Sequence, residues 1–365
     1  MNNETYGFIG LGLIGGSIAR AIKEKQPQAK IVAYTPHRET VDKACEEHIV
    51  DKPIYEIGED FSECDYIFLC APVECNNDNL DKLLPYLNKK TTLTDIGSVK
   101  ATIHNKVKEL ALEDQFIGGH PMTGTERIGF GNSKSSLLQN AYYILTTTEA
   151  TEKERLDRYY DLVKSIGAIP LVVDHNRHDY ITAAISHVPH VIAASLVNLV
   201  KDNDSEDQLM KTIAAGGFKD ITRISSSSPV MWQQICTTNA ENISDLLGKY
   251  IDSLYEIKLA IDERESEKIY DFFSSAREYR ESFIDTSSGP IQKVHSINVE
   301  INDQPGQLAS VALLLSEHSL NIKNMGIVHN REYERGTLRI ELHDKESLGK
   351  AIEILSSAGY NVYQK

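Results

Sequence analysis

The sequence is poor in cysteine and in basic residues, and it has no long uninterrupted apolar run. Its five cysteines are scattered and form no C-x-x-C pair, which argues against a disulfide framework and a thiolate metal site: Cys45, Cys64, Cys70, Cys75 and Cys236. Lysine and arginine total 38 against 53 acidic residues, and the net charge of −15 argues against binding to nucleic acid or anionic membranes. No segment approaches the roughly 18 unbroken apolar residues of a membrane-spanning helix, and the amino end has no signal-peptide pattern. We therefore expect a cytoplasmic protein that captures any anionic ligand through local positive charge.

The amino end contains a short apolar strand, a glycine turn and the start of a helix, in the run Tyr6-Gly-Phe-Ile-Gly10-Leu-Gly12-Leu13-Ile14-Gly15. That order is the context that a dinucleotide-binding fingerprint requires. Gly10 permits a tight turn, Gly12 lets backbone amides approach a pyrophosphate, and Gly15 lets the helix pack on the strand. The spacing alone also fits an ordinary turn, so the choice of a redox enzyme depends on the motifs further along the chain.

With 365 residues, 41% of them hydrophobic, the chain is long enough for two or three domains. Residues 1–172 alternate strand-like and helical runs, which predicts an α/β domain with a Rossmann-type, doubly wound parallel sheet. After the first strand, the expected strands are Lys30–Tyr34, Tyr66–Cys70, Thr91–Asp95, Gln115–Gly118 and Tyr142–Thr146. Ligands bind beyond the carboxyl ends of such strands. We therefore expect Ala71-Pro72, Gly97-Ser98 and Gly119-His120 to line one crevice.

Residues 173–285 show helical periodicity with almost no strand signal, which predicts an all-helical second domain. The expected helices are Asp179–Asp202, Glu206–Ala215, Pro229–Ile261 and Glu263–Ile284. The first of them is rich in small residues, so we expect it to be buried, either across a dimer interface or in the core of the chain: Ala183, Ala184, Ala193, Ala194 and Ser195. A turn-rich linker is expected at 286–293.

Residues 294–365 follow a βαββαβ order, which predicts a compact ferredoxin-like unit. Its first strand is expected at Val294–Ile301 and its helices at Gln307–His318 and Leu348–Ala358. Asp303, Pro305, Gly306 and Leu308 form a stretch that resembles the D-x-P-G-x-L loop of ACT domains. This resemblance implies binding of an amino acid and regulation of a biosynthetic enzyme. The alternative interpretation is a Pro-Gly turn that caps a helix.

His120 is the leading candidate for catalysis, because it stands at an expected strand end beside glycines that let a ligand approach. Histidine is the side chain best suited to accept a hydroxyl proton near neutral pH. Glu126 either orients His120 or is a solvated loop charge. Ser98 follows another strand and opens a helix, so we expect it to cap that helix and also to reach His120 or a nicotinamide.

The helical domain supplies further polar candidates. His187 and His190 share a helix face at i, i+3 and could chelate a metal, but no third or fourth ligand accompanies them, so we expect no metal. Instead, one or two histidines would project toward the crevice. Arg223 follows a glycine turn at Gly216-Gly217 and would bind a carboxylate through two hydrogen bonds, with a surface salt bridge as the alternative.

Taken in order, these motifs resemble those of bacterial prephenate dehydrogenases with a carboxyl-terminal ACT domain, over nearly the whole chain. The matching stretches are Gly10–Ser17, Asp95–Lys100, Gly119–Glu126, His178–Tyr180, Ser186–His190 and Gly216–Arg223 with Trp232. The resemblance implies that His120 is the catalytic base, Ser98 its hydrogen-bonding partner and Arg223 the clamp on the ring carboxylate. It also implies substrate contacts from His178, His190 and Trp232, and a homodimer formed by the helical domain.

The implied reaction is the oxidative decarboxylation of prephenate to 4-hydroxyphenylpyruvate in tyrosine biosynthesis, with hydride transfer to a nicotinamide. It needs the nicotinamide against the hydroxyl-bearing carbon, a base, a carboxylate anchor and exclusion of water. A crevice between the first two domains would supply all four. Because the base must be neutral, we expect activity to fall as the pH drops through the pKa of His120, within the range of about 5 to 8 where histidine titrates.

The nucleotide preference depends on the segment after the second strand, Ala33-Tyr34-Thr35-Pro36-His37-Arg38. NAD-binding fingerprints carry an acid in this region for the ribose hydroxyls, but no acid occurs here before Glu39. Thr35 could bond a ribose hydroxyl and Arg38 could meet a 2′-phosphate, so NADP stays open. The family precedent favours NAD, held by the glycine turn together with Ala71 and Pro72.

Three other functions remain as alternatives. An arogenate dehydrogenase would use the same site, and the sequence does not distinguish its substrate from prephenate. A 3-hydroxyacid dehydrogenase also joins a nucleotide domain to a helical one but would normally use a lysine as base, whereas an amino-acid sensor would lack catalysis. The resemblance further implies feedback inhibition by tyrosine, bound near Asp303 to Leu308 or, alternatively, in the active site.

Overall fold

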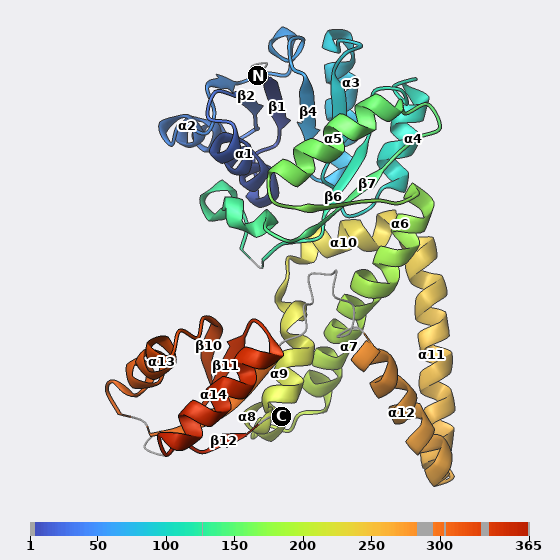
Figure 1. The fold of residues 1–365 in the computed structure, drawn as a ribbon. Helices are drawn as coiled ribbons and strands as arrows, with labels where there is room; N and C mark the ends of the chain where they lie inside the picture. Colours follow the sequence, from blue (N-terminus) through green and yellow to red (C-terminus); the bar gives the residue numbers. More distant parts are fainter. Residues whose placement is uncertain (1–3, 126, 283–294, 303, 330–335, 364–365) are drawn as a thin grey trace. The chain divides into compact units, whose positions relative to one another are not determined.

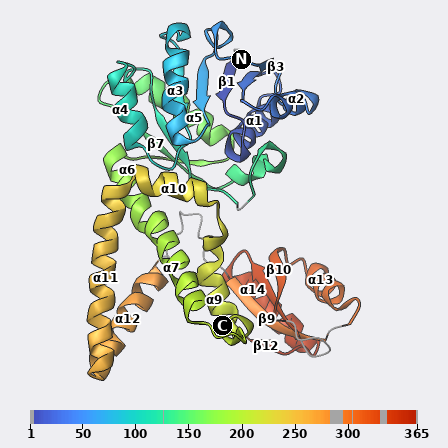
Figure 2. The ribbon, with the colours of Figure 1, turned by 180° about the vertical axis from the view of Figure 1, so that it is seen from behind.

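The computed structural model describes residues 4–125, 127–282, 295–302, 304–329 and 336–363. The chain divides into two compact units, residues 1–259 and residues 260–365. Figures 1 and 2 show the ribbon from opposite sides. All five cysteines are free.

A five-stranded parallel sheet with the order β3-β2-β1-β4-β5 is the centre of the first unit. Its strands are β1 (Thr5–Ile9), β2 (Lys30–Tyr34), β3 (Lys52–Ile54), β4 (Tyr66–Leu69) and β5 (Thr92–Asp95). The helices between and after them are α1 (Leu13–Lys25), α2 (Arg38–Glu46), α3 (Val73–Leu83), α4 (Ala101–Glu109) and α5 (Lys153–Ser165). The predicted doubly wound α/β sheet is confirmed in these elements.

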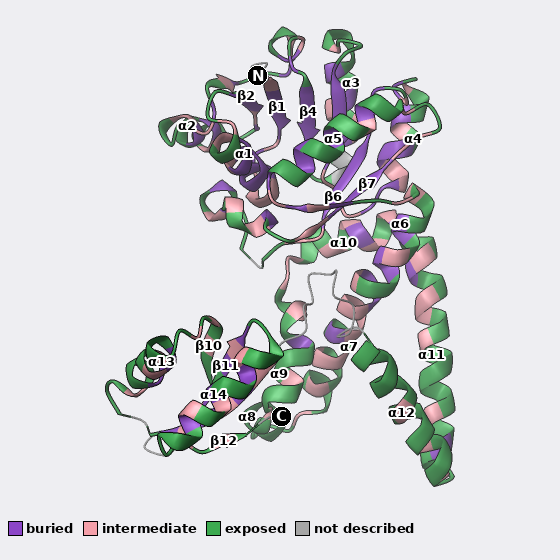
Figure 3. Cartoon of the chain, viewed as in Figure 1, coloured by how far each residue is buried: buried purple, intermediate pink, exposed green. Residues whose placement is uncertain are grey.

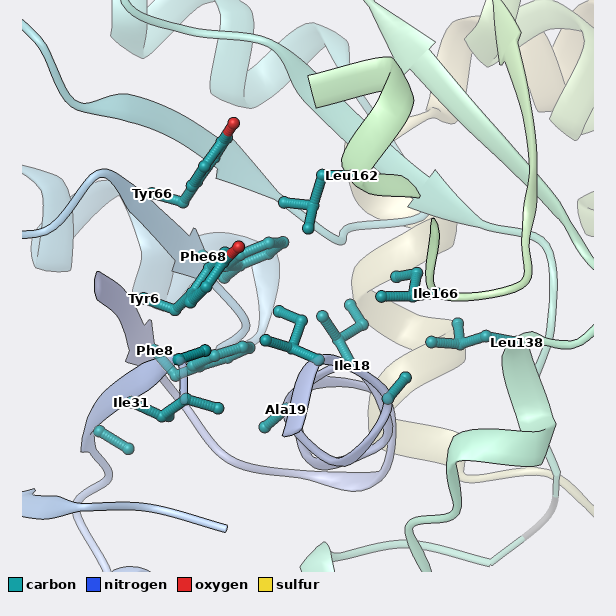
Figure 4. Close-up of a cluster of buried hydrophobic side chains, with 14 of the residues drawn as sticks. Tyr6, Phe8, Ile18, Ala19, Ile31, Tyr66, Phe68, Leu138, Leu162 and Ile166 are labelled. Carbon is teal, nitrogen blue, oxygen red and sulfur yellow. The ribbon is translucent and has the colours of Figure 1, made fainter. Parts of the chain in front are cut away.

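Apolar side chains fill both faces of this sheet. On one face, Tyr6 and Phe8 of β1 stack on Tyr66 and Phe68 of β4, with ring centroids 5.4 and 4.9 Å apart (Figure 4). Side chains of α1, α2 and α5 complete the cluster. The other face is covered by α3 and α4. Each fully buried aromatic contributes about 2–3 kcal/mol, so this double cover makes the sheet a firm base for loops at its carboxyl edge.

The sheet continues in a way that the sequence does not predict. β6 (Gly118–Pro121), β7 (Tyr142–Thr146) and β8 (Ile169–Val172) form a three-stranded sheet in which β6 runs antiparallel to β7. The expected strand Gln115–Gly118 is reduced to one parallel bridge between Leu93 and Phe116. His120 therefore lies inside β6, paired with Ile144, and not after a strand end as predicted.

Helices make up the rest of the first unit, and the last of them continues to Asp262 across the boundary of the unit. A continuous helix comprises α6 (His175–Thr182), a π-helical turn η5 (Ala183–His187) and α7 (Val188–Asn203). Pro189 explains the irregular turn, because proline has no N–H for the carbonyl one turn earlier and its ring crowds that carbonyl. The chain continues through α8 (Leu209–Ile213), α9 (Gly216–Thr222), the short η6 (Arg223–Ser226), α10 (Pro229–Thr238) and α11 (Ala240–Asp262).

Two expectations about these helices are wrong. Gly216 and Gly217 do not form a separate turn, because they open α9. The expected helix Pro229–Ile261 is divided at Asn239, whose side chain donates a hydrogen bond to the Asp179 carbonyl oxygen over 2.8 Å. The side chain is buried in that contact, which holds the break between α10 and α11 against α6.

The small-residue helix is not buried within the chain, contrary to one of the two alternatives above. Ala183 and Ala193 are buried, but Ile185 is 62% exposed and Leu199 is 59% exposed. Figure 3 shows intermediate and exposed residues along much of α7. By length and composition alone, the whole helix His175–Asn203 is also long and apolar enough to cross a membrane, a property that it shares with core helices of soluble proteins. An apolar face of this length that the chain itself leaves exposed indicates a surface for interaction with another molecule.

The second unit has the element order that the sequence predicts. After α12 (Ser266–Ser282) come β9 (His295–Ile301), α13 (Gln307–Glu317), β10 (Ile322–His329), β11 (Gly336–Leu342), α14 (Lys345–Ser357) and β12 (Val362–Tyr363). The strands form an antiparallel sheet in the order β10-β11-β9-β12. Alternate residues of β9 and β11 are buried against α13 and α14, which confirms the βαββαβ order.

A loop after β6 packs closely against α1 at Gly16. A Cβ atom at Gly16 would lie 2.7 Å from Phe130 and 2.8 Å from Ser133, in the segment of η3 (Phe130–Asn132) and η4 (Ser135–Leu138). The Lys134 amide donates to Ser17 Oγ over 3.0 Å, and Arg20 Nε donates to Ser133 Oγ over 2.8 Å. The second half of the glycine-rich run therefore packs a protein loop.

We predict that Gly16→Ala lowers the free energy of unfolding by about 1–3 kcal/mol, because the added methyl overpacks this contact. Gly248→Ala is the matched control, since Gly248 lies on α11 with nothing within 4 Å of its Cβ position. There the better helix propensity of alanine should raise the stability by up to about 1 kcal/mol. Urea denaturation measures the free energy of unfolding of both variants. A Gly16→Ala variant stabilised like the control would contradict the close packing at Gly16.

Candidate functional site

The glycine turn brings the ends of β1 and β4 into contact. Gly10 has φ of +97°, and a Cβ there would lie 2.7 Å from the backbone of Cys70 and Ala71. A Cβ at Gly15 would lie 3.0 Å from the Cys70 side chain. Gly12, the N-cap of α1, has open space where its side chain would be, and the first turn of α1 has no acidic residue. α1 begins at Leu13 and Ile14, and no side chain caps its first amides. This open helix end suits a bound pyrophosphate.

Neighbouring strand ends frame the same turn. The Gly10 amide donates to the Tyr34 carbonyl oxygen over 2.8 Å, which places Thr35 beside the turn. Asn76 holds Ala71, because its side chain accepts from the Ala71 amide at 3.2 Å and donates to the Ala71 carbonyl oxygen at 2.9 Å. The residues predicted to bind a dinucleotide thus lie together around the carboxyl ends of β1, β2 and β4, with Pro72 as the N-cap of α3.

A buried ion pair holds β5 against the strand that carries His120. The Lys100 ammonium pairs with the Asp95 carboxylate and donates to the Gly119 carbonyl oxygen over 2.8 Å. Asp95 also accepts from the Gly119 amide at 3.1 Å. Lys100 is fully buried, and this burial lowers its pKa although Asp95 favours the charged form. Lys100 is therefore a structural cation that is not presented to a substrate.

A chain of three side chains leads from His120 to a carboxylate. His120 Nδ1 lies 2.8 Å from His178 Nε2, and His178 Nδ1 lies 2.7 Å from Asp179 Oδ1. An ionised carboxylate only accepts hydrogen bonds, so His178 donates from Nδ1 and its Nε2 accepts from His120 Nδ1–H. His120 Nε2 is then left with a free lone pair. This order of donors makes Nε2 of His120 the basic nitrogen of the site.

Asp179 has a second task at the start of α4. Its two carboxylate oxygens accept from the backbone amides of Lys100 at 2.7 Å and Ala101 at 2.8 Å. The predicted cap, Ser98, is wrong: α4 begins at Ala101, and a side chain from α6 satisfies its first amides. Within the described residues no hydrogen bond joins Ser98 to His120 either, and the partner of His120 Nδ1 is His178.

Burial keeps the histidines of the site neutral. Burial, with help from the charges of His178, Lys100 and His187, holds the pKa of His120 well below 6.5. Burial also lowers the pKa of His178, although its hydrogen bond to Asp179 opposes that shift. For Asp179, burial disfavours ionisation, but hydrogen bonds from His178, Lys100 and Ala101 prevail and lower its pKa. A neutral base beside a charged carboxylate is the result.

A second cluster gathers the other predicted residues of the helical part. The ring of His190 stacks on Trp232, with centroids 3.7 Å apart. Burial lowers the pKa of His190, although its hydrogen bond to the Ile224 backbone opposes that shift, and the charge of Arg223 lowers the pKa further. Arg223 is the first residue of η6, which packs against α7. The Trp232 indole nitrogen is buried and has no hydrogen-bond partner in the described part of the chain. A cation, an imidazole and an unpaired indole donor together suit an anionic ring compound.

His187 connects the two clusters. Its ring lies 6.0 Å from that of Trp232 and its Nδ1 is 3.1 Å from the Asn239 side chain. Burial lowers the pKa of His187 to about 4. His187 and His190 therefore have separate partners, and no group of three metal-ligating side chains occurs in the described ranges. Glu126 lies outside the described residues.

Comparison with known proteins agrees with this geometry. Residues 18–172 match the family model of the prephenate dehydrogenase nucleotide-binding domain, and residues 174–275 match that of the prephenate dehydrogenase dimerization domain. The chain belongs to the prephenate dehydrogenase family. It is therefore a dehydrogenase, and the family resemblance drawn from the motifs is confirmed.

Members of the prephenate dehydrogenase family match almost the whole chain. The Bacillus subtilis (strain 168) prephenate dehydrogenase is 32% identical over 97% of this chain and 96% of its own length. A crystal structure of prephenate dehydrogenase from A. aeolicus with hydroxyphenyl propionate and NAD+ is 30% identical with a TM-score of 0.73, covering 78% of this chain and 99% of that one. Synechocystis arogenate dehydrogenase is 27% identical with a TM-score of 0.69, over 77% of this chain and all of that one. The family models end at residue 275, so the ACT interpretation stays a prediction.

Sequence reasoning missed the residues that organise the site. Asp179 and Lys100 lie within recognised motifs, where an acid beside a histidine and a lysine after a strand were the available signals. Asn76 and Asn239 carry no signal in the sequence, because their importance depends on contacts with Ala71 and Asp179.

We predict that Asp179→Asn lowers the turnover number of the dehydrogenase about 100-fold or more. The amide would face donors at Lys100, Ala101 and His178, and turning its NH2 toward His178 would reverse the tautomers along the chain. Asp174→Asn is the matched control, because Asp174 caps the same helix through the amides of Asn176 and Arg177 without touching a site histidine. Steady-state kinetics and thermal unfolding of both variants check this. Equal losses of turnover would contradict the positioning role of Asp179.

Proposed function

We propose that the protein catalyses the oxidative decarboxylation of prephenate to 4-hydroxyphenylpyruvate with NAD as hydride acceptor. The observation that carries the proposal is the chain from His120 to Asp179, which leaves a buried, neutral histidine with a free Nε2 lone pair. A base of this kind is what oxidation of a ring alcohol needs. The named relatives support the substrate, and the A. aeolicus complex with NAD+ supports the cofactor.

The open glycine turn fits the dinucleotide, as the space at Gly12 indicates. When bound there, NAD supplies an acceptor for the hydride of the carbon that carries the hydroxyl. His120 Nε2 takes the hydroxyl proton as the hydride leaves, and the ring carboxylate departs as CO2 while the ring becomes aromatic. The same proton returns from His120 to the phenolic oxygen. In between, His178 Nε2 stabilises the imidazolium of His120 by accepting a hydrogen bond from its Nδ1–H, and Asp179 in turn accepts a hydrogen bond from His178 Nδ1–H.

Arg223, His190 and Trp232 are proposed as the substrate anchor. Prephenate carries two carboxylates, and in a protein with a net charge of −15 their capture depends on a local cation. Arg223 would clamp the ring carboxylate, with His190 and the free indole N–H of Trp232 as further donors. Ser98 and Glu126 are proposed as additional catalytic contacts from the family resemblance alone.

Arogenate is the second candidate substrate, favoured by the likeness to an arogenate dehydrogenase and to a cyclohexadienyl dehydrogenase. It has the same ring and would use the same base and clamp. A 3-hydroxyacid dehydrogenase with a lysine base is disfavoured, because Lys100 is enclosed by Asp95 and Gly119. A non-catalytic sensor would not need the hydrogen-bonded series of His120, His178 and Asp179.

We also propose that the enzyme is a cytoplasmic homodimer whose helical part forms the interface. Support comes from the match to a dimerization domain and from the apolar side chains that a single chain leaves uncovered. Those side chains include Ile185, Leu199, Ile251, Leu254 and Tyr255.

The carboxyl-terminal unit is proposed as an ACT domain that binds tyrosine and inhibits the enzyme. Its βαββαβ order supports this, as does the loop at Pro305 and Gly306, where Gly306 caps α13 with φ of +90°. Leu308 is 40% exposed at that loop. Asp303 lies outside the described residues.

We predict that His120→Asn lowers prephenate turnover about 10²- to 10⁴-fold without changing the affinity for NAD. Arg223→Ala should raise KM about 10- to 100-fold with a smaller effect on kcat, because it removes a charged hydrogen bond to the substrate. His175→Asn is the control, since His175 lies on α6 outside the chain to Asp179. Formation of NADH is followed by absorbance, with prephenate and arogenate in turn. Absence of turnover with both substrates would overturn the proposal.

The pH dependence of kcat/KM follows from the lowered pKa of His120. The neutral form is the base, so activity is full above the pKa and falls as the pH drops through it. Because burial holds that pKa well below 6.5, kcat/KM should stay level from about pH 6.5 to 8. The fall that the sequence predicts is therefore expected below pH 6.5. An acid limb with its midpoint at or above 6.5 would contradict the assignment.

We predict that a chain ending at residue 290 keeps its turnover and loses inhibition by tyrosine. Dehydrogenase assays with increasing tyrosine, with phenylalanine as the control effector, compare it with the full chain. Full tyrosine sensitivity after truncation would place the inhibitory site in the active site instead.

A further inference from the structure

We infer that the segment after β2 binds the 2′-phosphate of NADP, so that this protein binds NADP at least as tightly as NAD. The inference rests on the proposed function, in which a nicotinamide dinucleotide occupies the glycine turn. It concerns the adenosine ribose of that dinucleotide, at some distance in the chain from the residues assigned to the reaction.

The first support is the lack of a carboxylate at the ribose. An acid after the second strand accepts hydrogen bonds from both ribose hydroxyls of NAD, and its charge repels the 2′-phosphate of NADP. Here Thr35 occupies the position after β2, and Glu39 is the first acid beyond it. Thr35 is 7% exposed, and its hydroxyl has no hydrogen-bond partner in the part of the chain that the structure describes. At this position a neutral hydroxyl therefore stands where an acid would repel the 2′-phosphate of NADP.

The second support is the position of this segment. Ile9 of β1 pairs with Tyr34 of β2, and the Tyr34 carbonyl oxygen accepts from the Gly10 amide over 2.8 Å. Thr35 therefore begins beside the first glycine of the turn that is proposed to hold the pyrophosphate. A dinucleotide that extends from this turn across the end of β2 brings its adenosine ribose to residues 35–38.

The third support is the cation at Arg38. Its guanidinium lies over the Tyr55 ring, 4.8 Å from the centroid, so the side chain is held in place while its charge stays accessible. The Tyr55 hydroxyl in turn donates to Asp42 over 2.8 Å. Asp42 lies one helical turn after Arg38 on α2, and its carboxylate is hydrogen-bonded to Tyr55. Within the described residues Arg38 forms no ion pair. A guanidinium stacked on a ring and open to solvent is suited to bind a phosphate.

The neighbouring charges favour an anion as well. Arg38 is the first residue of α2, and His37, its N-cap, provides no side-chain hydrogen bond to the helix. The first amides of a helix attract negative charge. Glu39 is next in sequence, but adjacent helical residues do not share a face. Thr35, Arg38 and the start of α2 thus provide a donor, a cation and free amides.

Isothermal titration of the full chain with NAD+ and NADP+ tests the inference without depending on turnover. We expect a Kd for NADP+ equal to or below that for NAD+, and tighter binding of 2′,5′-ADP than of 5′-AMP. Arg38→Ala should weaken NADP+ at least 10-fold and change NAD+ less than twofold. Arg158→Ala, which removes an exposed arginine on α5, is the matched control and should change neither. Thr35→Asp should weaken NADP+ at least 10-fold while NAD+ still binds.

Two results would overturn the inference: a Kd for NADP+ more than threefold above that for NAD+, or an unchanged NADP+ to NAD+ ratio in Arg38→Ala. Because Arg38 is exposed, this variant is expected to fold, and circular dichroism checks that it does. Binding of both dinucleotides without turnover of prephenate or arogenate would overturn the proposed function alone. If neither dinucleotide bound, both proposals would fail.

Discussion

Asp179 joins three parts of the first unit through its hydrogen bonds. Its carboxylate accepts from the first amides of α4 and orients His178, and its carbonyl oxygen holds Asn239 at the break between α10 and α11. A buried charge is stable only when such donors replace water. The same contacts therefore fix the position of α6 against the sheet and the tautomer of His120. The stability of this junction and the chemistry of the site depend on one residue.

The ion pair between Lys100 and Asp95 is a second constraint of this kind. A buried pair of charges contributes little net stability, because desolvation offsets the attraction. Its value here is geometric, since both partners also bind Gly119, next to His120. A side chain at Gly119 would lie 2.6 Å from the Asp95 carbonyl oxygen. Close backbone packing and the ion pair together fix the position of β6, the strand that carries His120.

The helical part has the opposite character, because one chain does not cover its apolar face. Ile185 and Leu199 lie on the helix that also carries His178 and His187. The helix thus has one side that builds the proposed site and another that needs a partner. In a dimer formed through this face, covering the apolar side would also stabilise the helix that holds Asp179. Assembly and catalysis would then depend on the same element.

The sequence by itself determined the features that are written in local patterns. Strand and helix alternation, the glycine turn at Gly10 to Gly15, the βαββαβ order at the carboxyl end and the His120 motif all follow from spacing within a few residues. The tertiary structure alone decided that Asp179, and not Ser98, caps α4, that His178 is the partner of His120, and that β6 runs antiparallel to β7. The physical reason is the separation of these groups along the chain: His120 and His178 are 58 residues apart, and Lys100 and Asp179 are 79 apart. Contacts over such distances leave no periodicity in the sequence, and they form only when the packed sheet and helices bring the residues together.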